Sequence, residues 1–264
     1  MLPFLFTLET MPNACIPKRY MRYTLVFCQQ GKLVIHVDDQ AFTLRANDVI
    51  TITSGQVHCF SEIGDASARI LEFTVDFMCK TDNDIELIFE NGLFCHFDKN
   101  EVISLGEQTP VAGWLRSIGK ELYTQPYQHA TSIHSYMELI LVEINRTRVA
   151  SGYEIWKPEA LFLRFIEQVR AHFSEGLPLS KHADLLGTTE LKLNELAKKY
   201  TGKTAQMVIY GLTTSEARRM LRYGNHSIKE VAFLLGFNDP FYFSNFFKKH
   251  TGVSPKVYKQ QLAV

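Results

Sequence analysis

The chain has 264 residues, of which 46% are hydrophobic and 21% are charged, and its 28 basic side chains balance its 28 acidic ones. This composition is typical of a folded globular protein and excludes a disordered or low-complexity chain. The length favours two domains over one or three.

The balanced net charge hides a difference between the two halves. Residues 1–156 hold 12 Lys and Arg against 19 Asp and Glu, a net charge of −7, whereas residues 157–264 hold 16 against 9, a net charge of +7. A basic half is expected of a domain that binds a polyanion such as nucleic acid. Solvated charged faces are common, however, so the charge alone does not decide between the two interpretations.

The five cysteines lie in the first hundred residues and form no Cys-x-x-Cys pair: Cys15, Cys28, Cys59, Cys79 and Cys95. An odd number without paired spacing favours buried free thiols in a reducing compartment and argues against a clustered zinc site. The apolar start of the chain lacks a basic segment and includes Glu9, so we expect neither a signal peptide nor a membrane-spanning helix. We therefore expect a cytoplasmic protein that makes no membrane contact.

The first predicted elements are short strands. From Tyr23 to Phe77, apolar and polar residues alternate in short runs, as they do in successive antiparallel strands. Turn-forming residues separate the runs, at Gly31, Asp38-Asp39, Asn47-Asp48 and Ser54-Gly55. This pattern predicts a small β-barrel or sandwich over about residues 20–100.

The turn rhythm of these strands is similar to that of a known family. From Gly31 to His58 the sequence reads G-x-L-x-I and then L-x-x-x-D-V-I-x-I-x-x-G-x-x-H, which resembles the cupin-like sensor domain of the AraC/XylS regulators. Cupin enzymes hold a metal with a His-x-His pair, a Glu and a later His, and His36 and His58 lack these partners. We therefore expect no metal and no cofactor. The interpretation that remains is packing or the lining of an effector pocket by His36, His58 and Phe60.

Helical periodicity follows, from Trp114 to Tyr123 and from Ser132 to Val149, within a helical region of about residues 110–150. Apolar residues recur in the second helix at intervals of three and four, which makes one wide stripe. The stripe either packs on the barrel or forms a homodimer interface, the function of this helix in the similar family. The interface candidates are Ile133, Tyr136, Met137, Ile140 and Ile144. The pattern is lost over residues 150–158, which predicts a sensor and dimerisation domain of residues 1–152 and a second domain of residues 157–264.

The second domain contains an internal repeat with a period of about fifty residues. The segments 182–205 and 231–255 each have an Ala in a short apolar helix, a Leu-Gly turn, and a second helix that ends in Lys-Lys and Thr-Gly. The small Ala183 and Ala232 allow two helices to cross closely, and Gly187 and Gly236 allow the sharp turn between them. Each copy therefore predicts one helix-turn-helix unit.

Local signals place the helices of the second copy. Ser227 and Glu230 form a capping box, and Asp239-Pro240 predicts the start of the next helix. In that helix Phe243 and Phe247 should face the core. The surrounding aromatic residues have helical spacing, so we interpret them as core packing, not as a platform for stacking bases.

The run SIKEVAFLLGFNDPFYFSNFFKKHTGVSPKVYK is similar to the signature of the AraC/XylS DNA-binding domain, and the match extends back to about Leu161. The resemblance implies an α+β protein with a cupin-like barrel, a helical dimerisation segment and an all-α domain of two helix-turn-helix units. A long helix over about 205–223 would join the units, which would enter successive major grooves about 34 Å apart. The implied DNA-binding residues are Thr189, Glu190, Lys192, Asn194, Glu195, Lys198, Asn238, Phe241, Ser244, Asn245 and Lys248.

Two positions depart from the family pattern. The family usually has Arg where this chain has Asn245, and often a basic residue where it has Glu195. An Asn can read adenine and a Glu can accept a hydrogen bond from cytosine N4. Alternatively, Glu195 makes the first unit a poor DNA reader that mainly braces the second.

Together these features predict a sequence-specific transcriptional regulator, not an enzyme. We expect it to bind double-stranded DNA as a homodimer, under the control of a small-molecule effector or a partner at the barrel, and to contact RNA polymerase if it is an activator. Two alternatives stay open: an interaction module whose helix-turn-helix units no longer bind DNA, and a cupin-type enzyme with a regulatory tail.

Overall fold

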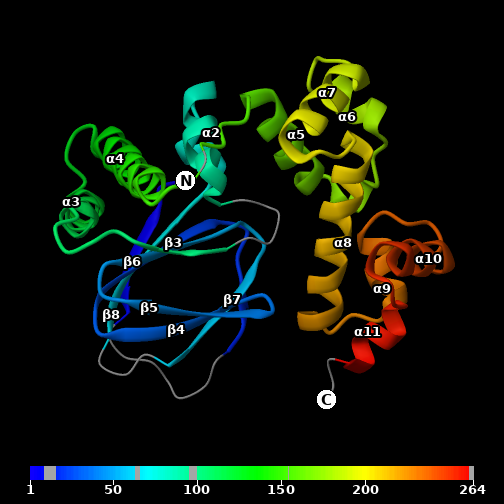
Figure 1. Ribbon diagram of the computed structural model, residues 1–264, viewed down its shortest axis with the longest axis horizontal. Coiled ribbons are helices and arrows are strands. Elements are labelled where there is room, and N and C mark those ends of the chain that lie inside the picture. The colour runs from blue at the N-terminus through cyan, green and yellow to red at the C-terminus, as the bar shows by residue number, and fades with distance from the viewer. Residues whose placement is uncertain (9–15, 63–65, 95–99, 154, 262–264) are drawn as a thin grey trace. The chain divides into compact units, whose positions relative to one another are not determined.

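The computed structural model describes residues 1–8, 16–62, 66–94, 100–153 and 155–261. The chain divides into two compact units, Met1–Lys157 and Pro158–Val264 (Figure 1). None of the described helices has the length and hydropathy that a membrane crossing requires.

The N-terminal unit contains two antiparallel sheets. The strands of one sheet, in spatial order, are β1 (Phe4–Leu8), β8 (Ser67–Phe73), β3 (Tyr23–Gln30), β6 (Asp48–Ile52) and β9 (Val102–Ser104). Those of the other are β2 (Lys18–Arg19), β7 (Val57–Glu62), β4 (Lys32–Val37) and β5 (Gln40–Arg45). Apolar side chains from both sheets meet in one buried core, among them Val26, Ile50 and Ile70 from the first and Ile35 and Phe60 from the second. This confirms the predicted cupin-like barrel.

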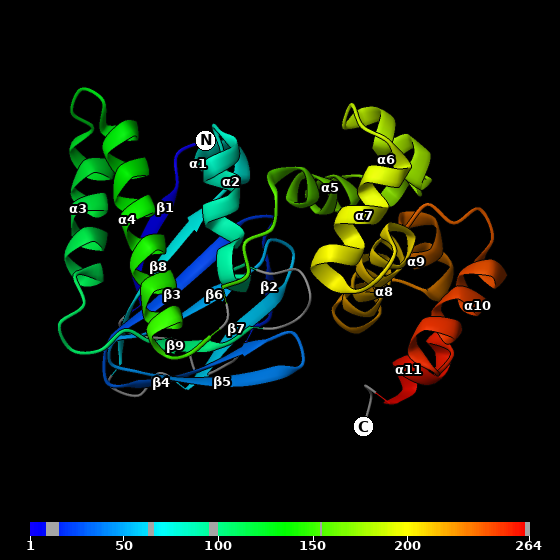
Figure 2. The same cartoon turned by 45° about the horizontal axis from the view of Figure 1, so that its top comes forward.

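Helices complete the N-terminal unit. They are α1 (Val75–Met78), α2 (Asp82–Phe89), the 3-10 helix η1 (Glu90–Gly92), α3 (Val111–Thr124) and α4 (His129–Ala150). Figure 2 shows α3 and α4 lying side by side as a pair. The inner face of α4 also contacts α2, η1 and β9.

The packing of α4 corrects the predicted dimer interface. Ile133, Met137, Ile140 and Ile144 are buried inside the N-terminal unit, because the apolar stripe faces α2, α3 and β9. These four side chains are therefore not available to a partner in this fold. Tyr136 is half-buried, and the large apolar residues of α4 that are exposed are Leu139 and Val149.

The cysteines depart in part from expectation. Cys28 is a buried free thiol and Cys79 is a half-buried one. Cys59 is disulfide-bonded, so the expectation of free thiols is wrong for this residue. Cys15 and Cys95 lie outside the described residues.

The C-terminal unit is helical. Its elements are α5 (Ala160–Ala171), the 3-10 helix η2 (Phe173–Glu175), α6 (Leu179–Leu185), α7 (Glu190–Thr201), α8 (Ala205–Tyr223), α9 (Ile228–Leu234), α10 (Pro240–Thr251) and α11 (Pro255–Gln261). Helices α6 and α7 form the first helix-turn-helix unit, and α9 and α10 form the second. The connecting helix α8 has the predicted bounds, 205–223.

Small residues set the spacing in both units, as predicted. Ala183 and Ala232 are buried where the supporting helices pack, and Gly187 and Gly236 adopt positive φ in the turns. The turn of the second helix-turn-helix unit also lies close against the backbone that leads into α6, because a Cβ on Gly236 would lie 2.5 Å from the amide nitrogen of Gly176. Gly236 therefore serves both the turn of its own unit and the close approach to this backbone.

Candidate nucleic-acid interface and effector site

Side chains start both recognition helices. The hydroxyl of Thr189 accepts a hydrogen bond from the backbone N–H of Lys192 at 3.2 Å at the start of α7. The Asp239 carboxylate accepts one from the N–H of Phe241 at 2.9 Å, and Pro240 occupies the first turn of α10. The reciprocal bonds between Ser227 and Glu230 start α9. The predicted capping box and the predicted start of α10 are confirmed.

The helix α10 has a buried face and an exposed one. Phe243 and Phe247 are fully buried in the core of the second unit, as predicted. Four predicted contact residues are exposed: Asn238, Phe241, Asn245 and Lys248. Ser244 is half-buried, and its hydroxyl donates to the carbonyl oxygen of Pro240 at 2.8 Å. Phe241, Asn245 and Lys248 recur at intervals of four and three, so they lie on one accessible face of α10.

The side chain of Asn194 is used inside the first unit. Its amide nitrogen donates to the carbonyl oxygen of Glu190 at 3.0 Å, and its Oδ1 accepts from the N–H of Ala205 at 3.0 Å. The residue is half-buried and joins α7 to the start of α8. Because one N–H and the oxygen of the amide are used inside the unit, Asn194 has only its second N–H left to donate, and its contact with DNA stays a prediction.

The other predicted residues of the first unit are exposed, namely Thr189, Glu190, Lys192, Glu195 and Lys198. The carboxylate of Glu195, the residue that departs from the family pattern, lies 3.6 Å from the ammonium of Lys192. The acidic side chain therefore already has a cationic partner. An exposed pair of this kind contributes little to stability and is readily exchanged for another partner.

A further lysine of α7, Lys199, is exposed and forms an ion pair. The Lys199 ammonium lies 2.7 Å from the Glu159 carboxylate, which also accepts from the Tyr200 hydroxyl at 3.1 Å. These bonds lower the pKa of Glu159 and raise that of Lys199. The contact ties α7 to the start of α5. Lys198 and Lys248, near the ends of α7 and α10, are exposed and have no such ion pair with a described residue.

Sequence reasoning missed the exposed Leu191 of α7 and wrongly assigned the exposed Tyr242 of α10 to the core. Leu191 is 72% exposed in the second position of α7, which corresponds to Phe241, 81% exposed, in α10. Tyr242 is 66% exposed. Large apolar residues that a fold leaves in solvent mark an interaction surface when they cluster. Reading the two repeats side by side would have paired Leu191 with Phe241.

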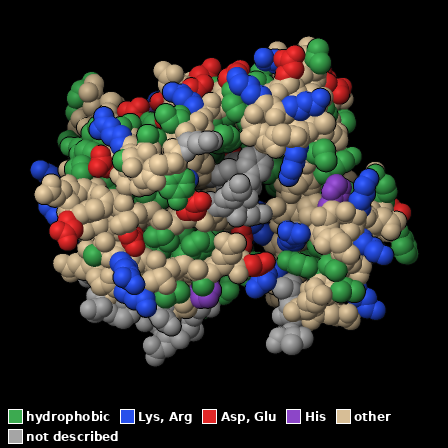
Figure 3. Space-filling model, in the orientation of Figure 1, with side chains coloured by type: hydrophobic (Ala, Val, Ile, Leu, Met, Phe, Trp, Pro, Cys, Tyr) green, Lys and Arg blue, Asp and Glu red, His purple; other side chains and the backbone are tan. Residues whose placement is uncertain are grey.

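The excess of basic side chains in the C-terminal unit also favours this surface as an interaction surface. Figure 3 shows Lys and Arg side chains spread over the visible face of the C-terminal unit. Residues 157–264 carry 16 basic against 9 acidic side chains. Cations at the ends of α7 and α10 sit next to exposed polar and apolar groups, which is the arrangement that holds a phosphate backbone while other side chains reach the bases.

In the barrel, the structure separates the three predicted pocket residues. The strand register pairs Val37 with His58 and Ile35 with Phe60, so His58 and Phe60 face the buried core. His36 pairs with Cys59, which places it on the opposite face of the sheet, and its Nε2 lies 3.0 Å from the Ser61 hydroxyl. The prediction of one pocket with all three residues is therefore wrong for His36.

The environment of His58 favours its neutral form. Burial lowers its pKa to about 4, and the charge of Lys18 acts in the same direction. Its Nδ1 has no hydrogen-bond partner among the described residues. The ring lies 6.0 Å from that of Tyr20. These contacts fit a packed core histidine.

One group of described residues has the composition of a metal site, and it lies outside the strands. Asp84, His134 and Glu138 place potential ligand atoms within 4.8 Å of one another. The Asp84 carboxylate accepts the N–H groups of Lys80 and Thr81, each at 2.8 Å, in the capping box of α2. His134 Nε2 lies 2.8 Å from the carbonyl oxygen of Met78. These bonds give the group a structural function, because Asp84 caps α2 and His134 joins α4 to the end of α1.

Comparison with known families matches both halves of the chain. Residues 182–261 match the model of a helix-turn-helix domain, and residues 20–74 match that of a cupin domain. The two matches fall on the helical unit and on the barrel.

The chain is also similar to curated relatives and to solved structures. The chain is 27% identical over 137 residues to the HTH-type transcriptional activator RhaS of Enterobacter sp. (strain 638), covering 52% of this chain and 48% of the relative. It is 30% identical over 125 residues to RhaS of Escherichia fergusonii, covering 47% and 44%. The chain thus spans about half the length of these relatives. A structure of ToxT from Vibrio cholerae is 11% identical, covers 99% of this chain and 98% of its own, and has a TM-score of 0.45.

Proposed function

We propose that this chain, which carries both domains of the AraC/XylS family of regulators, binds specific DNA sequences and regulates transcription. Its site of action is then the cytoplasm, where the bacterial chromosome lies. The outer faces of α7 and α10 contact DNA, and the barrel receives a signal.

The observation that carries the proposal is the outer face of α10. Asn245 and Lys248 are exposed and make no hydrogen bond or ion pair with any described residue, while Phe243 and Phe247 anchor the other side of the helix. An unpaired amide and an unpaired ammonium on a rigid helix are free to meet a base edge and a phosphate.

Within this face the residues divide by chemistry. The Asn245 amide can bond adenine N6 and N7 in the major groove, and Phe241 can contact a thymine methyl group. Lys248 lies at the end of the helix and reaches a phosphate. Lys198 occupies the matching position of α7 and has the same role.

The test compares Asn245→Ala with Lys248→Ala in the full chain. Each variant is titrated with a DNA site selected from random sequence, across a range of salt concentrations. Loss of the Asn should cost about 1 to 3 kcal/mol and relax preference at one base pair, whereas loss of the Lys should weaken all sequences alike and reduce the salt slope by about one unit. If the wild type shows no salt-dependent binding, the interaction-module alternative holds. If Lys248→Ala alters sequence preference and Asn245→Ala does not, the orientation of α10 is wrong.

The proposal extends to activation, because the curated relatives carry the name of transcriptional activators. An activator of this type would contact RNA polymerase beside its DNA site. Support for a small-molecule effector or a partner at the barrel comes from the cupin match over residues 20–74. Reporter transcription in the presence and absence of the chain measures the direction of regulation.

We also propose that the chain acts as a homodimer through the outer face of α4. Leu139 and Val149 are exposed on this helix, and Tyr136, three residues before Leu139, is half-buried. Sedimentation of the full chain should give a dimer that Leu139→Glu converts to a monomer. A dimer unaffected by this change, or a monomeric wild type, would remove α4 from the interface.

A further inference from the structure

Three side chains that can bind a metal converge where α2 packs on α4 (Figure 2). Asp84 comes from α2, and His134 and Glu138 come from consecutive turns of α4. One potential ligand atom from each residue lies within 4.8 Å of the other two. The spacing of four residues places His134 and Glu138 on the same face of α4. The group therefore brings one imidazole and two carboxylates within reach of a single ion.

The hydrogen bond of His134 fixes which ring nitrogen can bind a metal. Its Nε2 lies 2.8 Å from the carbonyl oxygen of Met78, and a carbonyl oxygen only accepts hydrogen bonds, so Nε2 carries a proton. In the neutral ring Nδ1 is then an acceptor without a proton. This nitrogen lies 3.6 Å from Oε2 of Glu138. Histidines that bind metals commonly donate their other ring N–H to a backbone carbonyl, so the ring is oriented as a ligand would be.

The two carboxylates have no basic partner in the described part of the chain. Neither Asp84 nor Glu138 forms an ion pair with a described Lys or Arg. Asp84 is only 6% exposed and uses Oδ2 to accept the N–H groups of Lys80 and Thr81, which leaves Oδ1 for another partner. The Lys80 ammonium instead lies 6.0 Å from the ring centroid of Phe77. With a neutral imidazole, three acceptors meet beside a buried carboxylate, and a cation stabilises such an arrangement.

The donor set favours zinc among the common divalent ions. Imidazole suits zinc, whereas calcium and magnesium prefer oxygen ligands alone. In a tetrahedral site with bonds of about 2.0 to 2.1 Å, two ligand atoms lie about 3.4 Å apart. The 3.6 Å between Nδ1 of His134 and Oε2 of Glu138 is close to this value. The side chain of Glu138 is 40% exposed, so it can rotate to close the remaining separation.

We propose that Asp84, His134 and Glu138 bind one Zn²⁺ ion, with water as the fourth ligand. The ion joins α2 to α4 within the N-terminal unit and is independent of the barrel histidines His36 and His58. Because the three ligands come together only in the folded unit, zinc stabilises the folded chain. The alternative is an ion pair, in which a protonated ring of His134 donates from Nδ1 to Glu138 and no metal binds.

The test measures zinc binding to the full chain after treatment with EDTA. Titration with ZnCl₂ in a calorimeter should show a site for one ion per chain, and MgCl₂ should not compete for it. Glu138→Gln removes a charged ligand at a solvent-accessible position, so it should weaken zinc binding at least about tenfold, the equivalent of about 1.4 kcal/mol. Glu143→Gln is the matched control, because it makes the same change five residues later, on another face of α4, and should leave zinc binding unchanged.

Two further measurements identify the ligands. Zinc should raise the melting temperature of the wild type and of Glu143→Gln, but not that of Glu138→Gln. X-ray absorption of the zinc-loaded chain should show nitrogen and oxygen at about 2.0 to 2.1 Å and no sulfur at about 2.3 Å.

Three results overturn the proposal: a wild type that binds no zinc, equal zinc affinity of Glu138→Gln and the wild type, or sulfur among the zinc ligands. His134→Ala should also abolish binding. This variant loses the bond to Met78 as well, so circular dichroism checks its fold, and if it is unfolded the pair of glutamate variants decides alone. No DNA is present in these experiments, so their result is independent of the proposed function.

Discussion

From the start of each recognition helix, the two helix-turn-helix units correspond residue by residue with an offset of fifty: Thr189 with Asp239, Glu195 with Asn245, and Lys198 with Lys248. The scaffold is the same in both, since each helix has a capping oxygen and ends at a glycine with positive φ. The exposed chemistry differs. Glu195 is paired with Lys192, whereas Asn245 makes no hydrogen bond or ion pair with any described residue. The two copies share the geometry that holds the recognition helix and differ in the side chains that are available to contact bases.

The largest expected difference between the units lies at their turn glycines. A Cβ on Gly187 meets no atom within 4 Å, whereas one on Gly236 would lie 2.5 Å from the backbone nitrogen of Gly176. Both residues have positive φ, so Gly187→Ala should lower the free energy of unfolding by about 1 to 2 kcal/mol through strain alone. Gly236→Ala adds a backbone clash and should cost about 3 to 5 kcal/mol.

Urea unfolding of the two full-length variants, monitored by circular dichroism, measures how much free energy of unfolding each variant loses. Equal losses of stability would show that the Gly176–Gly236 contact does not hold the two units together. The turn glycines of the two helix-turn-helix units would then contribute equally to stability.

The second prediction concerns base reading. Asn245→Ala should reduce discrimination at one base pair by about 1 to 3 kcal/mol. Glu195→Ala should leave sequence preference intact and tighten binding a few fold, because it removes a negative charge beside phosphates and releases Lys192. Affinities for sites with each base substituted in turn test both variants. If Glu195→Ala relaxes preference at a cytosine, the first unit reads bases and does not merely brace the second.

Features that depend on local signals could be predicted from the sequence. The capping box at Ser227, the start of α10 at Asp239 and the burial of Phe243 and Phe247 each depend on residues within one or two helical turns. The bounds of α8 follow in the same way, because turn residues flank the helix on both sides.

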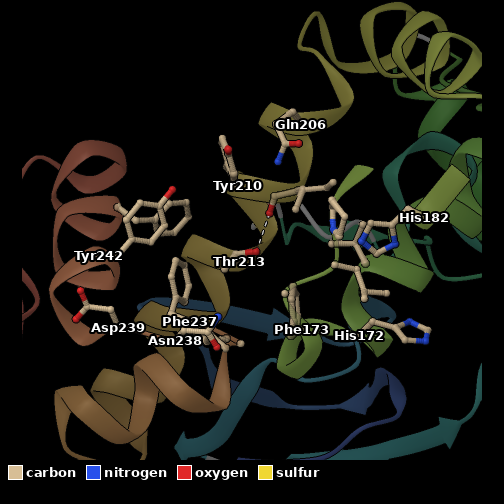
Figure 4. A pocket seen from close by; sticks show the side chains of 18 residues that line it. His172, Phe173, His182, Gln206, Tyr210, Thr213, Phe237, Asn238, Asp239 and Tyr242 are labelled. Carbon is tan, nitrogen blue, oxygen red and sulfur yellow. Dashed lines mark hydrogen bonds between the residues drawn. The ribbon is translucent and has the colours of Figure 1, made fainter. Parts of the chain in front are cut away.

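Features that depend on a distant partner could not be predicted. The sequence predicts Asn194 as a contact residue, and only the structure shows that its Oδ1 accepts a hydrogen bond from the N–H of Ala205. Periodicity located the apolar stripe of α4 but not the elements that cover it. The C-terminal unit has a cavity of about 430 Å³ that is lined by residues from 169 to 246, so only the assembled fold brings them together (Figure 4). The outward direction of His36 could have been predicted from the sequence, since His36 alternates along the strand with the buried Ile35 and Val37.

The third prediction compares the helix caps. The Asp239 carboxylate caps α10 and also places a negative charge at the positive end of the helix dipole, whereas the Thr189 hydroxyl contributes the hydrogen bond alone. Asp239→Ala should therefore cost about 1 to 2 kcal/mol and Thr189→Ala about 0.5 to 1 kcal/mol. The same urea titrations measure both, with Asp239→Asn as the control that keeps the capping oxygen and removes the charge. A larger loss at Thr189 would contradict the assignment of the dipole contribution.

The smallest expected effect lies in the supporting helices, where the first unit buries His182 and the second buries Val231 at the matching position. Burial and then the charge of His172 lower the pKa of His182, against the opposing influence of Glu175. The folded state thus binds a proton less readily than the unfolded state, so stability is greatest above the ordinary histidine pKa of about 6.5 and falls with decreasing pH. His182→Val removes this dependence and should be near neutral for stability at high pH, because an unsatisfied polar group is exchanged for an apolar one. Urea unfolding of wild type and His182→Val between about pH 8 and pH 5 should therefore show curves that diverge in favour of the variant as the pH falls. Parallel curves would mean that His182 titrates alike in the folded and unfolded states, and that the two supporting helices do not differ in their response to protons.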